Sequence, residues 1–533
     1  MHRRPLSAAL LARSTAALLL TASVQLSCTA STLREDAGTI EDSATRDAGG
    51  DVLDAGRDAG DGTDTGTDAG DDTDAGSDLD AGIAVGPPCE KTQGVCAGAA
   101  HARLEDGGFE PTCTALSYGS DYEPAETRCD GLDNDCDGET DRHWATLFPR
   151  SEGSTWNVPV ARMDGGYVAL AQERDGGFSL RRFDDQLEAL AEPEPLKPAG
   201  TGYLDGPALL NTAQGIALTY ERRGQQDVTD FYVPLSAEGL LLRGNDGEPF
   251  YSSLNTTPGF PYGSLRTAPS FDGSKVLVSF HETDAGTPFM AYATEVLGLV
   301  TDPLGNIVTP RTSLMRVRVE GAGLFPKSVL GVEDGFVLAV SEWPPELGMA
   351  FTLRLQRFSS ALAPVGSERT IELLSETDAH LANVPADPGS GGPPQPVLVY
   401  RESFADGGSG LFVVRNLFDG GEPEAWNDVA ADTAFLRALG TPRGLQVAWK
   451  TVTYCPECIS PTGIRGTSRG RVFARGEDSG VVDLTPSTAD LDFDPYARPG
   501  VGLTAGPDGW MTFFLPVLQE GGVELRAVSY CAP

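Results

Sequence analysis

The densest group of side chains with metal-binding chemistry lies between Cys129 and Asp141, in the stretch CDGLDNDCDGETD. Three aspartates alternate along this stretch, and a glycine follows directly after the third. Alternating carboxylates let one tight turn aim several hard oxygen atoms at a single cation, and the glycine permits the sharp bend that adds a backbone carbonyl. We therefore predict a calcium site whose ligands come from Asp133, Asp135, Asp137, Glu139 and Asp141.

This loop departs from a complete EF-hand. Its twelfth position, where an EF-hand carries a bidentate glutamate, is Trp144, so water, Asp130 or a neighbouring segment must complete the coordination shell. Two alternatives stay open. The first is a metal-free set of turns held together by disulfides. The second is a transition metal, which an all-oxygen ligand set does not favour.

Residues 126–141, ETRCDGLDNDCDGETD, resemble the metal-binding motif of MopE-related bacterial surface proteins. The upstream Cys89, the segment 93–98 (QGVCAG) and Cys113 resemble the cysteine-bearing lead-in that accompanies this motif in exported lipoproteins. The resemblance covers about residues 89–142. It implies metal binding at the cell surface. Because one group of the family is associated with copper, metal capture is an alternative function.

The N-terminus has the pattern of a bacterial export signal. Arginines precede the short apolar segment 16–22 (AALLLTA), which ends near Ser27 and Cys28. A small residue before a cysteine at this distance resembles the lipobox of bacterial lipoproteins. We therefore expect residues 1–28 to be a signal peptide with acylated Cys28 at its end and the membrane to be a partner through this lipid anchor. Ordinary signal cleavage, giving a secreted or periplasmic protein, is the alternative.

Residues 29–84 form a low-complexity segment rich in Asp, Gly, Ala and Thr. So few apolar residues cannot offset the entropy of ordering, so we predict a disordered tether. The formal net charge of the whole chain is −38. Phosphates are repelled by such a charge, which argues against nucleic acid as a partner.

Nine cysteines are present, and acylation of Cys28 leaves eight that can form disulfides in an exported protein. Five are clustered and three lie far downstream, so complete pairing requires a bridge between the two groups. We predict that Cys531 is tied back to the cluster and that Cys455 pairs with Cys458; half of a zinc site is the less favoured reading of that pair. The candidates are Cys89, Cys96, Cys113, Cys129, Cys136, Cys455, Cys458 and Cys531.

After Trp144 one pattern recurs seven times: an apolar strand, a turn rich in Gly, Asp or Pro, and a second alternating strand. Two further strands fit in each interval, which predicts four-stranded blades. We therefore expect an all-β fold, a seven-bladed β-propeller, and keep tandem β-sandwiches as the alternative. The copies begin near Gly166, Gly215, Lys275, Gly335, Pro396, Gly444 and Gly509.

Five of the seven apolar strands end on glutamate. In a propeller such equivalent positions form a ring, and a carboxylate ring could bind cations or a polyol ligand. The favoured interpretation is that the repeated glutamate caps a turn and belongs to the repeat itself. The residues concerned are Glu173, Glu221, Glu282, Glu342 and Glu402.

Catalytic motifs are weak in this sequence. The stretch 466–470 (GTSRG) matches G-x-S-x-G, but a nucleophile elbow requires a strand, a sharp turn and a helix. The five histidines show no metal-ligand spacing. A binding role is therefore favoured over catalysis, and a hydrolase or lyase that acts on envelope or extracellular polymers is the alternative.

The organisation we predict is a signal peptide (1–28), a tether (29–84), a Cys-rich metal-binding module (85–143) and a β-propeller (144–533). We expect an exported lipoprotein of the outer membrane or cell surface, with structural Ca²⁺ as its cofactor. The propeller is expected to bind a protein or a glycan.

Overall fold

The structure, a computed structural model, describes residues 85–531 with short gaps. Residues 1–84, and with them the predicted signal peptide, Cys28 and the tether, lie outside the described residues. Residues Gly82–Pro533 form one compact unit. The gaps are 151–157, 173–177, 197–202, 224–226, 245–248, 250–251, 259–264, 283–292, 319, 346–349, 376, 387–392, 405–408, 427–432, 452, 460–464, 477–479, 486–490, 494–501, 507–508 and 520–521.

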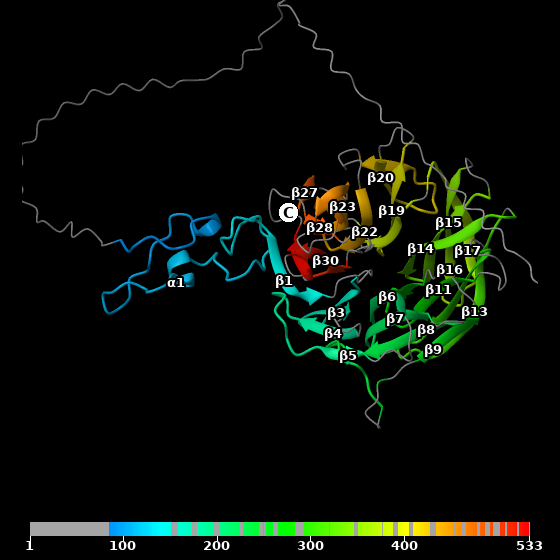
Figure 1. The fold of residues 1–533 in the computed structure, drawn as a ribbon, viewed down its shortest axis with the longest axis horizontal. Helices are drawn as coiled ribbons and strands as arrows, with labels where there is room; N and C mark the ends of the chain where they lie inside the picture. Colours follow the sequence, from blue (N-terminus) through cyan, green and yellow to red (C-terminus); the bar gives the residue numbers. More distant parts are fainter. Residues whose placement is uncertain are drawn as a thin grey trace, which may run out of the picture. The chain divides into compact units, whose positions relative to one another are not determined.

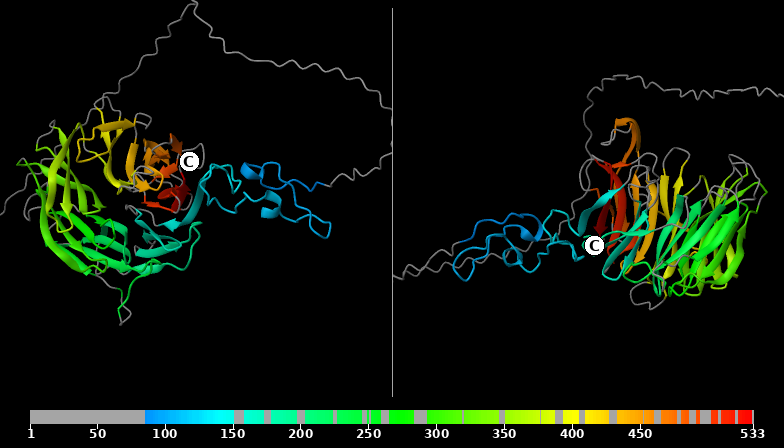
Figure 2. Two further views of the ribbon diagram at one scale, coloured as in Figure 1. Left: turned by 180° about the vertical axis from the view of Figure 1, so that it is seen from behind. Right: turned by 60° about the horizontal axis from the view of Figure 1, so that its bottom comes forward.

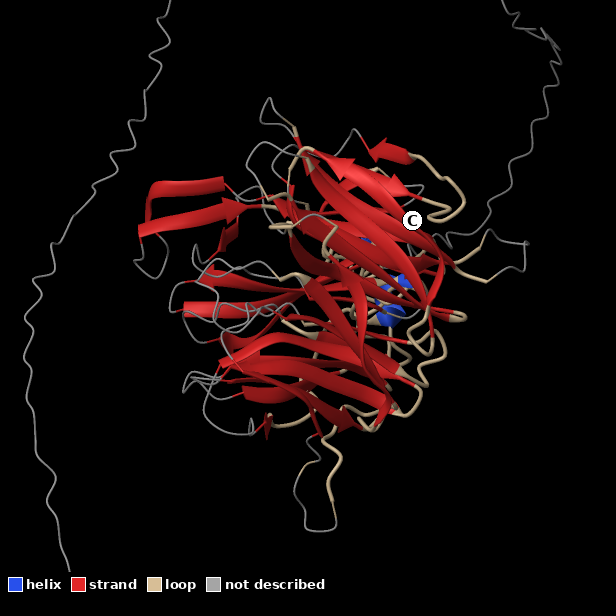
Figure 3. Cartoon of the chain, turned by 90° about the vertical axis from the view of Figure 1, so that its right-hand side faces the viewer, coloured by secondary structure: helices blue, strands red, loops and turns tan. Residues whose placement is uncertain are grey.

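Seven four-stranded antiparallel sheets are arranged around a common axis and form a seven-bladed β-propeller (Figure 1). This confirms the predicted fold and excludes tandem sandwiches. Strands dominate the described residues, and the two short helices, η1 (Gly94–Cys96) and α1 (Ala115–Tyr118), precede the propeller (Figure 3). No helix in the described part of the chain is long and apolar enough to cross a membrane.

The first four blades follow one another without interruption in the sequence, each with its strands in chain order from the axis outward. Blade 1 is β2 (Val160–Met163), β3 (Gly166–Gln172), β4 (Phe178–Phe183) and β5 (Glu194–Leu196); blade 2 is β6 (Tyr203–Thr212), β7 (Gly215–Arg223), β8 (Asp227–Leu235) and β9 (Ser252–Pro258); blade 3 is β10 (Arg266–Pro269), β11 (Val276–Glu282), β12 (Glu295–Thr301) and β13 (Ile307–Arg316); blade 4 is β14 (Gly323–Val332), β15 (Gly335–Trp343), β16 (Phe351–Ser359) and β17 (Pro364–Leu373).

The last three blades contain an insertion and a strand from the N-terminal side. The insertion is a three-stranded sheet that extends beyond one face of the propeller (Figure 2, right). Blade 5 is β18 (Ala379–Val384), β19 (Gln395–Ser403), β20 (Ser409–Val414) and β21 (Pro423–Trp426); blade 6 is β22 (Thr433–Thr441), β23 (Gly444–Thr451), β26 (Val472–Gly476) and β27 (Val481–Asp483); the insertion is β24 (Thr453–Ile459), β25 (Arg465–Gly470) and β28 (Leu491–Phe493); blade 7 is β29 (Gly502–Ala505), β30 (Met511–Gln519), β31 (Gly522–Tyr530) and β1 (Arg142–Arg150).

The recurring apolar strand of the sequence is the second strand of each blade. In β15 all residues but the last are buried, because both faces of the strand pack against neighbouring blades. A strand buried on both faces gives a continuous apolar run. The outermost strand β13, by contrast, is largely exposed and has no such pattern.

Several second strands open with glycine because the third strand of the same blade passes too close for a side chain. A Cβ placed on Gly166 would lie 1.8 Å from the carbonyl oxygen of Phe183, and one placed on Gly335 would lie 2.1 Å from that of Phe358. The repeated glycine is therefore a steric requirement of the hairpin.

Apolar clusters fill all the interfaces between neighbouring blades, including the one between blades 7 and 1. That last cluster joins Val158 and Tyr167 of blade 1 to Phe514 and Leu525 of blade 7. The inner strands also contact one another around the ring, β2 with β29 included. The ring is therefore closed by a hydrophobic core as continuous as that between any other two blades.

Blade 7 is completed by β1, which comes from the N-terminal side of all the other blades. It pairs antiparallel with β31, from Arg142 opposite Tyr530 to Arg150 opposite Val523. The indole Nε1 of Trp144 also donates to the carbonyl of Leu484 in blade 6, at 2.7 Å. The first and last strands of the propeller thus belong to one sheet.

Candidate metal site

The module before β1 is held together by disulfides. Cys89 pairs with Cys113 and Cys96 pairs with Cys136. These cysteines and Tyr118 form its small buried cluster. A segment of this size cannot bury enough apolar surface for a core of its own, so the disulfides supply much of its rigidity.

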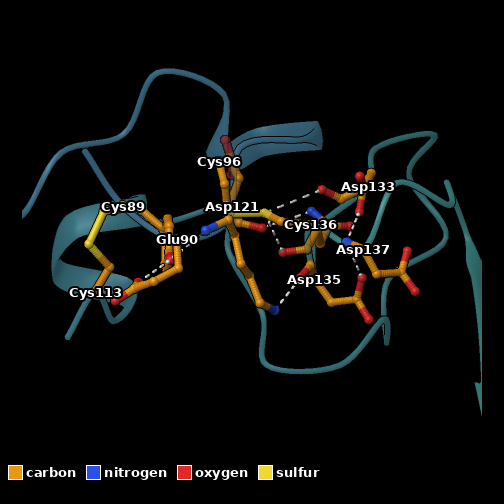
Figure 4. Close-up of a disulfide and its surroundings, with 12 residues drawn as sticks. Cys89, Glu90, Cys96, Cys113, Asp121, Asp133, Asp135, Cys136 and Asp137 are labelled. Carbon is orange, nitrogen blue, oxygen red and sulfur yellow. Dashed lines mark hydrogen bonds between the residues drawn. A yellow bond between two sulfur atoms is a disulfide. The ribbon is translucent and has the colours of Figure 1, made fainter.

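The aspartate loop is a series of turns stabilised by its own carboxylates. The buried carboxylate of Asp133 accepts hydrogen bonds from the backbone N–H groups of Asp137, at 3.1 Å, and Gly138, at 2.9 Å. Asp135 Oδ1 also accepts from the Asp137 N–H, at 3.2 Å. Asp133, Asp135 and Asp137 lie together around Cys136 (Figure 4). The loop therefore has the turn geometry that the D-x-D-x-D-G pattern predicts.

Glu126 is the third member of the carboxylate group, although it lies upstream of the loop. Carboxylate oxygens of Glu126, Asp133 and Asp135 all lie within 4.8 Å of one another, and all three residues are buried. Glu126 Oε2 accepts from the Asn134 N–H at 2.9 Å, whereas Oε1 is buried and has no hydrogen-bond partner. A buried acceptor without a donor is costly, and a cation would satisfy it.

The electrostatics of this group favour a bound cation. Burial raises the pKa of Glu126 to about 7, with the charges of Asp135 and Asp141 adding to the effect and backbone N–H donors opposing it. Burial, and then the charge of Asp137, raises the pKa of Asp135. Glu126 and Asp135 thus resist ionisation, chiefly because they are buried. A divalent cation coordinated by these oxygens would favour the ionised carboxylates.

The remaining predicted ligands lie outside the three-carboxylate group. Asp137 is exposed, and Glu139 forms an ion pair with Arg142 at the start of β1. The buried carboxylate of Asp141 accepts from the N–H groups of Asp130, at 3.1 Å, and Gly131, at 3.0 Å. The structure therefore brings together Asp133 and Asp135 of the predicted set and adds Glu126.

The lead-in segment packs directly against the loop. The Val95 N–H donates to the Asp133 carbonyl at 3.1 Å. A Cβ on Gly94, whose φ is +53°, would lie 2.2 Å from that same oxygen, and a Cβ on Gly138 would lie 2.2 Å from Gln93 Oε1. Glycine at both positions lets the two segments approach closely.

The donor chemistry fits a hard cation such as Ca²⁺ better than copper. The three converging side chains offer oxygen alone, the donor that Ca²⁺ prefers. A second group in the described residues, Glu90, His101 and Cys113, includes a sulfur already bonded to Cys89. That sulfur is not available as a thiolate, the soft ligand that copper prefers.

The site is linked covalently and by hydrogen bonds to the end of the propeller. Cys129 forms a disulfide with Cys531, which confirms the predicted bridge between the cluster and the C-terminal cysteines. The Cys531 N–H donates to the Asp141 carbonyl, and Arg443 Nη2 donates to the Cys129 carbonyl, each at 3.1 Å. We call these contacts the clasp. The predicted pairing of Cys455 with Cys458 concerns side chains outside the described part of the structure.

Four of the five predicted glutamates lie on second strands, one strand away from the axis: Glu221, Glu282, Glu342 and Glu402. Glu342 Oε1 accepts from the Arg318 N–H at 2.8 Å, and Glu402 Oε1 accepts from the Leu374 N–H at 2.8 Å. In both cases the donor belongs to the segment that leads into the blade. Glu221 is buried at the equivalent position, and the side chains of Glu173 and Glu282 lie outside the described residues.

The G-x-S-x-G match has no elbow geometry. Ser468 lies inside β25, where it pairs with Tyr454 of β24 and Phe493 of β28. The next element is another strand, β26. A nucleophile elbow needs a strand-to-helix turn, which this segment lacks.

No protein-family model matches the chain, and no curated protein matches it. Similar solved structures include AofleA from Arthrobotrys oligospora (11% identity, covering 68% of this chain and 95% of that chain, TM-score 0.32). They also include the WD40 domain of Toxoplasma gondii coronin (10% identity, covering 74% of this chain and 87% of that chain, TM-score 0.39). A further similar structure is the SapL1 lectin in complex with alpha methyl fucoside (13% identity, covering 64% of this chain and 99% of that chain, TM-score 0.34). Because these TM-scores are low, the assignment of a β-propeller rests on the sheets of this chain and not on these similarities.

Proposed function

We propose that this chain is a lipid-anchored protein of the Gram-negative cell envelope, in which a calcium-stabilised module clasps a β-propeller that binds a protein or a glycan. The export signal, the cysteine at position 28 and the acidic low-complexity segment support the anchoring. The motif of residues 126–141, which resembles that of MopE-related surface proteins, supports both the metal and the surface location.

The observation that carries the metal proposal is the buried Oε1 of Glu126, which has no donor and lies beside two buried aspartates. Glu126, Asp133 and Asp135 would hold the ion, and Ca²⁺ would supply the positive charge that the three carboxylates lack. The backbone N–H groups of Asn134, Asp137 and Gly138 already orient these carboxylates.

The attachment of the module to the propeller indicates a structural role for the module. It precedes β1 directly, and the clasp ties it to the last residues of β31 and to blade 6. Stiffening the loop therefore stabilises the strand that closes the ring. We assign calcium a structural role in the proposed function and the propeller the binding role.

Calcium titration of the chain from residue 29, followed by calorimetry, tests the metal. We expect one saturable binding event with Ca²⁺ and weaker heat with Mg²⁺, because a flexible oxygen shell suits the larger ion. Absence of heat with Ca²⁺ would overturn the proposal.

The anchor and the ligand need separate experiments. Metabolic labelling with a fatty-acid analogue should label the wild-type chain and not Cys28→Ala; equal labelling would contradict acylation at Cys28. Glycan- and protein-array binding should use residues 85–533, because β1 and Cys129 are needed to close the propeller. Failure to bind any array member in the closed form would count against the binding role.

A further inference from the structure

We propose that the innermost strands of blades 3 to 6 form a binding site for a small ligand with two or more oxyanion groups, either carboxylate or phosphate. Four consecutive inner strands each contribute one basic residue. All four residues are half-buried. We call them the inner basic cluster: Arg266 of β10, Lys327 of β14, His380 of β18 and Arg437 of β22.

Contacts between inner strands hold the cluster in place. Arg266 Nε donates to the Lys327 carbonyl at 3.1 Å, reaching from blade 3 to blade 4. Arg437 Nη1 lies 3.1 Å from His380 Nε2, reaching from blade 6 to blade 5. Because a guanidinium is always a donor, Nε2 accepts, and a neutral His380 carries its proton on Nδ1. That N–H is a further donor for an anion.

The four residues lie on adjoining inner strands, and the charges of the other three act on His380. Burial, and then the charges of Arg437, Arg266 and Lys327, hold the pKa of His380 well below its usual value. The charge of Arg266 also lowers the pKa of Arg437, although blades 3 and 6 are not neighbours. The blades are arranged around a common axis, so the inner strands of blades 3 and 6 both face the centre of the ring (Figure 1).

The charge of the cluster contrasts with that of the chain. The whole sequence carries a formal net charge of −38, whereas the cluster combines three cations with a neutral imidazole. The charge of Asp378 opposes the lowering of the Arg437 pKa. A ligand with two or more negative charges can interact with several of these cations at once.

The donors suit oxyanions specifically. Two guanidinium groups, an ammonium group and an imidazole N–H can all donate to carboxylate or phosphate oxygens. The bulge between Pro326 and Ser328 inserts Lys327 as an extra residue in β14. Bulges redirect a side chain, and this one occurs at the residue that adds the fourth donor. The site does not depend on the calcium module, so the two proposals can fail independently.

Citrate and inorganic pyrophosphate are the probes, titrated into the full chain by calorimetry and by NMR of the histidine side chains. We expect one or both anions to bind and to shift the ring signals of His380, assigned with His380→Asn. Citrate binding alone would indicate a ligand with carboxylate groups, and pyrophosphate binding alone a ligand with phosphate groups. No binding by either anion, or binding without any change at His380, would overturn the proposal.

Lys327→Gln supplies the mutational test, with Lys275→Gln as the matched control. Lys275 lies in the turn before β11, outside the inner strands. We expect Lys327→Gln to weaken anion binding about tenfold, the size of one charge-assisted hydrogen bond, and Lys275→Gln to leave it unchanged. Equal loss in both variants would show a non-specific charge effect and contradict the site. Arg266→Gln replaces Lys327→Gln if the latter does not fold.

Discussion

Cys531 forms a disulfide with Cys129, which lies 402 residues earlier in the chain. Between these two residues the polypeptide completes the whole propeller, so the bond joins the last strand to the segment just before the first. The Asp141 carbonyl, two residues after the Gly138–Glu139 turn, accepts from the N–H of the same Cys531. One residue therefore connects the aspartate loop to the closure of the ring.

Removing this bond should destabilise the propeller. In the chain-entropy model a bridge across so long a loop is worth about 4–5 kcal/mol. We expect Cys129→Ala with Cys531→Ala to lower the unfolding temperature measured by calorimetry. Cys89→Ala with Cys113→Ala is the control, because that bridge spans 24 residues within the module and should leave the propeller transition in place. Equal shifts in both double variants would argue against a clasp.

Glu126 should matter more for calcium than the exposed Asp137. Glu126→Gln removes a charge from the buried group of three, whereas Asp137→Asn changes a residue outside it. We expect calcium affinity to fall at least about tenfold in the first variant and much less in the second, since each 1.4 kcal/mol of binding energy is tenfold. The linear D-x-D-x-D-G template predicts the opposite order, so titration calorimetry of the two variants decides between them.

Two neighbouring arginines of β16 should differ sharply in their effect on stability. Arg354 is buried and pairs with Glu342 at 3.0 Å and with Glu368 at 2.6 Å, whereas Arg357 pairs with the exposed Asp334. Removing one partner of a buried ion pair costs about 3–5 kcal/mol, and an exposed pair contributes about 0–1 kcal/mol. Urea unfolding of Arg354→Met and Arg357→Met should show this difference, and comparable losses would contradict it.

His380 should make the fold sensitive to acid. Burial, followed by the charges of Arg437, Arg266 and Lys327, lowers the pKa of its imidazole, so the unfolded chain takes up the proton first as the pH falls. Stability is then complete above the unfolded value of about 6.5 and decreases below it. His380→Gln should reduce the loss of melting temperature between pH 7 and pH 5. An unchanged pH profile in His380→Gln would refute the assignment.

The sequence was most informative about the strands that are buried on both faces. Second strands such as β15 give apolar runs, so seven copies were visible, whereas the exposed β13 and the four-residue β10 have no comparable pattern. The closing strand β1 precedes all the other strands in the sequence and pairs with the last one, β31. The signal for this closure was the odd number of cysteines in each of the two groups, which requires a disulfide between them.

Residues brought together by folding were harder to predict. Glu126 lies outside the D-x-D-x-D-G spacing and reaches Asp133 through the turn around Asn134, so no local template includes it. The inner basic cluster takes a single residue from each of four blades, and its members are separated by more than 50 positions. The glutamates at strand ends were recognisable as a repeat, but their distance from the axis depends on strand order.

Calorimetric unfolding of the chain with and without Ca²⁺, in the wild type and in the variant that lacks the Cys129–Cys531 bridge, tests whether the metal site stabilises the propeller through the clasp. We expect Ca²⁺ to raise the unfolding temperature of the wild-type propeller, and we expect this rise to be largely lost without the bridge. An unfolding temperature of the propeller that does not respond to Ca²⁺ in the wild type would contradict this expectation.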